Sequence, residues 1–232
     1  MNEHLSKQYD ADLEAIRTRV LQMGGLVEQQ ITCAMDGLAN GDHLLIDQVI
    51  NNDTRVNSHE VALDEACSHV IARRQPAAGD LRMIMTVVKT ITDLERIGDE
   101  AKKIAKMAKK IYEAQRAFVP NVELTHAAQL AIDMLRKALD AFARLDTVAA
   151  ADVVRQDRDV DAEFKSVMRQ LITFMMEDPR TISRGLDILF IAKSIERIGD
   201  HAKNMAEYVV YMVKGRDVRH VSLEEIEREA LR

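Results

Sequence analysis

The amino-acid sequence predicts an all-α protein built from two tandem three-helix bundles, with a short additional helix at the C-terminus. The composition is 47% hydrophobic but only 4% aromatic, with 12 Met and no Trp, which suits helix-on-helix packing better than a β-sheet core. The pentapeptide Glu-Arg-Ile-Gly-Asp occurs at 95–99 and again, 101 positions later, at 196–200. Both copies lie in long stretches without Pro, rich in Ala, Ile, Met, Lys and Glu. The chain is therefore expected to be an internal duplication of a helical unit.

The first half is expected to form three helices. Apolar residues recur at spacings of three and four from Leu13 onward, which predicts a bundle helix that runs to about Leu38. Asn40-Gly41-Asp42 supplies a C-terminal stop and then an N-cap, so a second helix is expected directly after it. Gln75-Pro76 closes the second helix. A third helix, which carries the first motif, is expected to reach about Arg116.

The second half repeats this plan. A fourth helix is expected over roughly 122–146 and a fifth from about 148 to 177. Asp178-Pro179 is interpreted as an N-cap with Pro at the first position of a sixth helix, which carries the second motif to about Lys214. Ser222-Leu223-Glu224-Glu225 matches a capping box and predicts a short polar terminal helix.

The boundary between the halves is expected at Phe118-Val119-Pro120-Asn121, which interrupts the helical pattern near mid-chain. The predicted division is residues 1–118 for the first bundle, 121–215 for the second and 216–232 for a tail with its short helix.

The third helix has a clear core face when it is plotted at 100° per residue. Its apolar stripe contains Val87, Leu94, Ile97, Ala101, Ile104 and Ala108. Roughly opposite, and therefore expected to be solvated, lie Asp93, Arg96, Glu100 and Lys103. The sixth helix repeats the stripe with Ile188, Ile191, Ile195, Ile198, Ala202 and Met205. His201 is expected to be a surface residue.

The acidic residues of each motif lie beside this stripe. Glu95 and Asp99, like Glu196 and Asp200, are four residues apart and share one helical face. Gly98 and Gly199 each cost a helix interior on the order of 1 kcal/mol relative to Ala. A cost that is present in both copies indicates a use, namely room for a neighbouring helix, an ion or water.

Each half is expected to place a second acidic pair opposite the motif. In an antiparallel hairpin, residues at one level have numbers that average to the turn. The pairs 57 with 95 and 53 with 99 average to 76, and 157 with 200 and 161 with 196 average to 178.5, so both turns contain Pro. The predicted quartets are Asp53, Asn57, Glu95 and Asp99 in the first half, and Asp157, Asp161, Glu196 and Asp200 in the second.

Such quartets favour a bound cation. Two carboxylates about 4 Å apart repel by about 4 kcal/mol at an effective dielectric constant near 20, so the cluster needs protons, basic partners or a metal ion. Oxygen ligands without His favour Mg²⁺, Mn²⁺, Ca²⁺ or iron over zinc. The competing interpretation is that Lys102, Lys106 and Lys203 neutralise these acids on a solvated face. The duplication and the matching levels favour the metal.

Composition and motifs exclude several classes of function for this chain. A formal charge of −6 argues against a nucleic-acid binder. Two cysteines, no apolar leader and no apolar run near twenty residues predict a cytoplasmic chain that does not insert into a membrane. No phosphate-binding Gly-rich loop, nucleophile elbow or triad is present, so no enzyme is expected. The alternative is a carboxylate-bridged metal enzyme of the helical-bundle class, although its Glu-x-x-His pattern is absent.

These residues also resemble the PhoU family. The resemblance rests on the duplicated motif, which matches that family's Glu/Asp-x-x-x-Asp signature, on Gln75-Pro76-Ala77-Ala78-Gly79-Asp80-Leu81-Arg82, and on the two halves of three helices. It covers essentially residues 5 to 214. Asn57, which stands where the second half has Asp161, departs from the duplicated acidic pattern.

The resemblance implies a non-catalytic cytoplasmic regulator of phosphate uptake and of the phosphate-starvation response, which binds metal ions on its acidic motifs and often forms a homodimer. It implies two partners, the ATPase of the phosphate ABC transporter and a sensor histidine kinase. The kinase would be kept from activating its response regulator while phosphate is plentiful.

Overall fold

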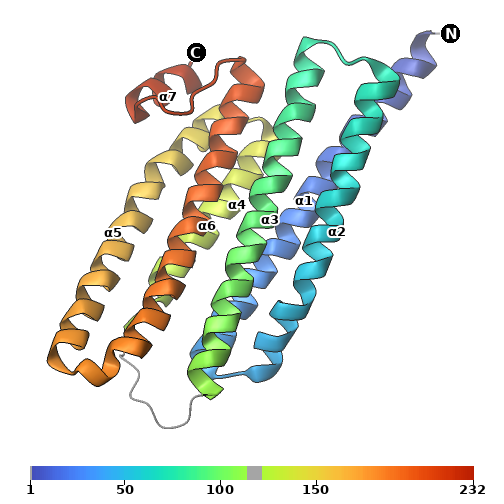
Figure 1. Ribbon diagram of the computed structural model, residues 1–232. Helices are drawn as coiled ribbons and strands as arrows, with labels where there is room; N and C mark the ends of the chain where they lie inside the picture. Colours follow the sequence, from blue (N-terminus) through green and yellow to red (C-terminus); the bar gives the residue numbers. More distant parts are fainter. Residues whose placement is uncertain (1, 114–121) are drawn as a thin grey trace.

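A computed structural model describes residues 2–113 and 122–232, and within these ranges it is helical without a strand. Figure 1 shows the long helices running up and down beside one another. The first bundle consists of α1 (Asn2–Asn40), α2 (His43–Arg74) and α3 (Ala78–Glu113). The second consists of α4 (Thr125–Arg144), α5 (Thr147–Glu177) and α6 (Ile182–Lys214), followed by α7 (Leu223–Ala230). The predicted all-α fold with an internal repeat is confirmed.

The turns between helices use the same local chemistry in both halves. Asp42 caps α2 by accepting hydrogen bonds from the amides of Leu44 and Leu45 at 2.9 and 3.2 Å. Asp146 caps α5 in the same way, through Val148 and Ala149 at 3.0 Å each. These side chains satisfy amide groups that have no partner inside the helix. The cap at Asp146 was not predicted from the sequence. Because of this cap, α5 begins at Thr147.

Several predicted helix ends differ from the structure. The fourth helix begins at Thr125 rather than near 122. Asp178 does cap a segment with Pro179 at its first position, but that segment is a 3₁₀ turn, η1 (Pro179–Thr181), and α6 begins only at Ile182. A single turn closed by Asp178 is tighter than an α-helix start. The predicted end of the third helix at Arg116 and the predicted boundary at Pro120 lie outside the described residues.

The two bundles lie side by side through their motif helices. α3 packs along α6 at the centre, α1 also packs against α4, and α2 and α5 lie on the outer flanks (Figure 1). The predicted apolar stripes of α3 and α6 are buried throughout. Because buried residues of both bundles form one continuous hydrophobic core, the repeats are held together by apolar packing as well as by the chain.

The face of α3 that was predicted to be solvated is partly buried, because α6 of the second bundle covers it. Asp93 and Glu100 are only 7% and 3% exposed. Glu100 accepts a hydrogen bond from Lys103 at 2.8 Å and lies 3.4 Å from Arg197 of α6. The expectation of solvated charge is therefore wrong for these two acids, whereas Arg96 and Lys103 are indeed exposed.

His201 also belongs to this interface, so its assignment as a surface residue is wrong. Its Nδ1 lies 2.6 Å from an oxygen of Asp93, and Asn204 donates to the same oxygen at 3.3 Å. A helical projection of one bundle cannot reveal a second neighbour. Polar groups opposite the core become buried when another bundle packs on them, and they then need partners such as these.

The C-terminal segment folds back onto the second bundle. Ser222 caps α7 by accepting from the amide of Glu225 at 3.3 Å. Ile226 and Ala230 are buried, so the helix predicted as polar has one apolar face. Of the described helices, none combines the length and the apolar character that crossing a membrane would require.

Candidate cation sites on the repeated motif

The glycine of each motif lets two helices approach closely. A Cβ atom added at Gly98 would lie 3.2 Å from Cγ1 of Val56 on α2, and one added at Gly199 would lie 3.3 Å from Cγ1 of Val160 on α5. Both distances are shorter than ordinary van der Waals contacts. The room left by the glycine is therefore filled by the neighbouring helix. This close approach brings the residues that neighbour Val56 and Val160 level with the motif.

The first-half site centres on Asp53, a buried carboxylate of α2 that is 2% exposed. Its Oδ2 accepts a hydrogen bond from Lys102 of α3 at 2.5 Å, and the Asn57 amide lies 3.5 Å from the same oxygen. The other oxygen of Asp53 and the side-chain oxygen of Asn57 are buried and have no hydrogen-bond partner among the described residues. This site therefore has acceptors that a bound cation or water would satisfy.

The motif acids of the first half are close enough to influence one another. Partial burial, followed by the nearby charge of Asp99, raises the pKa of Glu95, and Asp53 contributes in the same direction. Arg96 lies 3.5 Å from Glu95 and 3.7 Å from Asp99 and offsets part of this repulsion from an exposed position. The predicted level match between α2 and α3 agrees with this arrangement.

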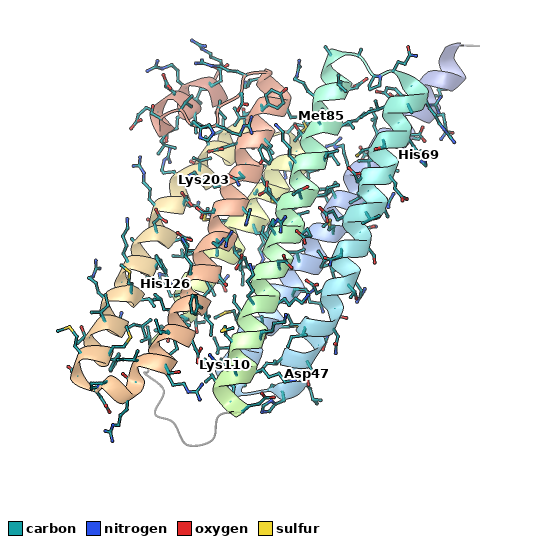
Figure 2. All side chains as sticks on the ribbon, viewed as in Figure 1. Asp47, His69, Met85, Lys110, His126 and Lys203 are labelled. Atoms are coloured by element: carbon teal, nitrogen blue, oxygen red, sulfur yellow. The ribbon has the colours of Figure 1, made fainter. Side chains whose placement is uncertain are left out.

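The second-half site repeats the lysine contact. Asp157 accepts a hydrogen bond from Lys203 at 2.7 Å, and Figure 2 shows Lys203 on α6 where that helix faces α5, below α7. Lys193 donates to both oxygens of Glu196 at 2.6 Å. Burial, and then the charges of Glu196 and Asp157, raises the pKa of Asp200 to about 6. Negative charge thus remains in excess around Asp200 despite the two lysines.

Glu60 is an acid of the first site that sequence reasoning missed. Burial raises its pKa, Arg96 opposes this, and Asp99 is near enough to raise it further. The sequence contained enough information to find it. Residues 60 and 92 also average to the turn at 76, so Glu60 lies about one helical turn beyond the quartet on α2. The equivalent position in the second half is Phe164, over whose ring Lys193 lies at 5.3 Å.

Lysine is the cation that the structure itself places in each site. Lys102 and Lys203 pair with Asp53 and Asp157, as the competing interpretation expected of those two lysines. Across the part of the chain that the structure describes, no three His, Cys, Asp or Glu side chains are grouped so that they could hold a metal ion. Metal binding by the two quartets stays a prediction, and it requires the lysines to be displaced.

Removing Lys102, the partner of the buried Asp53, is expected to destabilise the fold. Lys102→Met leaves the Asp53 carboxylate buried without its donor, and the free energy of unfolding should fall by about 1–3 kcal/mol. Lys106→Met, at an exposed position of the same helix, is the matched control and should stay within about 0.5 kcal/mol of wild type. Urea denaturation monitored by circular dichroism measures both. Equal losses in the two variants would show that the Asp53 contact contributes nothing.

The fold and the sites together define a class of protein: a duplicated three-helix bundle with one lysine-paired acidic cluster in each repeat. The model of the PhoU domain matches this chain twice, over residues 20–108 and 124–209, and the chain belongs to the PhoU family.

Relatives of known name match over nearly the whole chain. The phosphate-specific transport system accessory protein PhoU of Escherichia coli (strain K12) is 48% identical over 228 residues, which cover 98% of this chain and 94% of the relative. A PhoU homolog of that name from Burkholderia sp is 48% identical over 233 residues, with coverage of 100% and 99%. These names describe accessory proteins rather than enzymes.

Two crystal structures share the fold. PhoU from Pseudomonas aeruginosa superimposes with a TM-score of 0.86 at 47% identity and covers 90% of this chain and 100% of its own. The phosphate transport system regulatory protein PhoU from Streptococcus pneumoniae gives a TM-score of 0.83 at 28% identity, with coverage of 90% and 99%.

Proposed function

We propose that this chain is an accessory protein of a phosphate-specific transport system, and that it acts in the cytoplasm as a negative regulator of phosphate uptake and of the phosphate-starvation response. The observation that carries the proposal is membership of the PhoU family over both repeats, together with relatives of that name that match nearly end to end. The regulatory title of the Streptococcus pneumoniae relative supports the same role.

The proposed partners are the ATPase of the phosphate ABC transporter, the sensor histidine kinase and a second copy of the chain. The helices offer long, rigid faces for such contacts, and helical surfaces are a common means of protein recognition. Large apolar side chains remain exposed on α6 at Leu186 and Phe190, which are 41% and 59% exposed. Exposed apolar groups of this kind are suited to a partner surface.

Copurification tests the partner assignment. A tagged chain, isolated from gently solubilised cells, is expected to retain both the transporter ATPase and the kinase, with more kinase retained at high phosphate than at low. More kinase is expected at high phosphate because the proposed restraint of the kinase operates only while phosphate is plentiful. An untagged strain controls for non-specific recovery. Recovery of neither protein at either phosphate level would contradict the proposed coupling.

We further propose that each acidic cluster binds a hard metal ion, Mg²⁺, Mn²⁺, Ca²⁺ or iron. The unpartnered oxygens of Asp53 and Asn57 and the raised pKa of Asp200 support this, because each marks a place where further positive charge is favourable. Lys102 and Lys203 are long and partly exposed side chains, so their ammonium groups can move into water when a metal ion takes their place.

Melting curves test the metal proposal. A divalent ion at about a hundredfold excess over its Kd should stabilise the chain by about 2.7 kcal/mol. Glu196→Gln with Asp200→Asn should remove more of this gain than Glu95→Gln with Asp99→Asn, because the second quartet has four carboxylates whereas the first has three and the neutral amide of Asn57. Mn²⁺, Mg²⁺ and EDTA are compared for the wild type and both variants. A wild-type melting temperature that is identical in all three buffers would show that no such site exists.

Without metal, the second-half double variant is expected to have the opposite effect on stability. The folded-state pKa of Asp200, about 6, lies above its ordinary value of 3.8. Ionising this group therefore lowers stability as the pH rises between these two values, and the loss persists above them. In EDTA, the Glu196→Gln and Asp200→Asn double variant should be more stable than wild type above pH 6, and this advantage should shrink towards pH 4.

The carboxylate-bridged metal enzyme remains the alternative function. Assays for phosphatase and oxidase turnover on the metal-loaded chain are expected to give no activity above buffer. Turnover that disappears in the second-half double variant would favour the alternative.

A further inference from the structure

A polar pocket of about 380 Å³ lies where the C-terminal segment covers one end of α5 and α6. Lys203, one of its lining residues, lies below α7 in Figure 2. The volume is within the range of small-molecule sites. The pocket lies partly beyond the repeated sequence, because the segment after Lys214 supplies one wall. None of the residues predicted for the metal sites lies in that segment.

The wall is firmly attached. Arg155 of α5 donates to Glu227 of α7 at 2.9 and 2.6 Å, and the Thr147 hydroxyl donates to the carbonyl oxygen of Ala230 at 2.8 Å in a buried position. Val218, just after α6, is 1% exposed. Contacts at both ends of the segment keep the pocket open as a preformed feature, which lowers the entropic cost of binding.

Glu207 is the side chain of this pocket that most favours a ligand with a hydrogen-bond donor. This side chain lines the pocket, is only 9% exposed, and has no hydrogen bond or ion pair with any described residue. Burial raises its pKa to about 7, with Lys203 acting in the opposite direction. A ligand that donates a hydrogen bond would give this largely buried carboxylate a partner that the described residues do not supply.

The remaining lining has two further chemical characters. Arg158, Lys203 and Arg219 carry positive charge, and Arg158 forms no hydrogen bond or ion pair with any described residue. Asp157 is already engaged by Lys203, and Arg219 bonds Asp217 through Nε and Nη2 only, which leaves Nη1 available. The third character is apolar, from Val154, Val221, Leu223 and Ile226.

We propose that this pocket binds a small phosphate ester of nucleotide size that also carries hydroxyl or amino donors. The guanidinium groups of Arg158 and Arg219 bind the phosphate, as planar forks with several donors do. Glu207 accepts a hydrogen bond from a hydroxyl or amino group, and the apolar wall packs against the sugar or base. A bare cation would meet the guanidinium groups of Arg158 and Arg219, and a bare anion would leave Glu207 without a donor. The site goes beyond the proposed regulatory function.

Isothermal titration calorimetry on the full chain in EDTA tests this site, so that metal bridging plays no part. The probe is AMP, with ribose 5-phosphate, adenosine and inorganic phosphate as comparison ligands. Saturable binding of AMP is expected, with adenosine and inorganic phosphate each at least roughly tenfold weaker, because each lacks one of the two recognised groups. Equal binding of ribose 5-phosphate and AMP identifies a sugar phosphate as the recognised unit, and tighter AMP binding identifies a nucleotide.

Three variants locate the binding. Arg158→Ala and Glu207→Gln should each raise the Kd for AMP by about tenfold, since each loses a charge-assisted hydrogen bond. Arg169→Ala, at an exposed position lower on α5, is the matched control and should bind AMP as wild type does. Glu207→Gln removes a buried charge, so an unchanged or higher melting temperature shows that it folds. Absence of saturable AMP binding, inorganic phosphate binding as tightly as AMP, or wild-type affinity in both pocket variants would overturn the proposal.

Discussion

A strain that lacks this chain is expected to express its phosphate-starvation genes even in phosphate-rich medium. Under the proposed function, the chain keeps the sensor kinase from activating its response regulator while phosphate is plentiful. Without it, the kinase is unrestrained and its target promoters stay active. A reporter fused to a phosphate-starvation promoter, measured at high and low phosphate, gives the readout.

Complementation makes this test specific. The wild-type gene should restore repression at high phosphate. So should Arg96→Ala, because the Arg96 side chain is 57% exposed and its contacts with Glu95 and Asp99 are long. A reporter that still responds to phosphate in the deletion strain would contradict the regulatory function, whatever the variants do.

The largest effect on stability is expected from Leu94→Ala. Leu94 is fully buried in the α3 stripe. Removing its branched end leaves a cavity that the surrounding helices cannot close, so the free energy of unfolding should fall by about 2–5 kcal/mol. Urea denaturation of the purified chain, followed by circular dichroism, gives the difference.

Leu81→Ala provides a control with the same chemistry on the same helix. Leu81 is 40% exposed near the start of α3, so truncation removes much less buried surface and should cost under about 1 kcal/mol. A loss at Leu94 that is no greater than the loss at Leu81 would show that the α3 stripe is not tightly packed. Such a result would also weaken the assignment of α3 as the central helix.

The structure shows why some site residues were predictable and others were not. Local spacing placed Glu95 beside Asp99, and the hairpin turn placed Asp53 opposite them. Glu60 follows the same arithmetic, but the duplication does not point to it, because Phe164 stands at the equivalent position of the second repeat. The pairing of Lys102 with Asp53 was one of two interpretations, and geometry alone distinguishes which lysine reaches the buried carboxylate.

The sequence by itself determined the helical class, the duplication and the apolar stripes of α3 and α6. These follow from period, turn residues and repetition, which are local along the chain. Only the tertiary structure decided the burial of Asp93, Glu100 and His201 between the bundles and the polar pocket under the C-terminal segment. Both depend on which surfaces meet across long sequence separations. A helix has two sides that can be covered, and its periodicity reveals only the more apolar one.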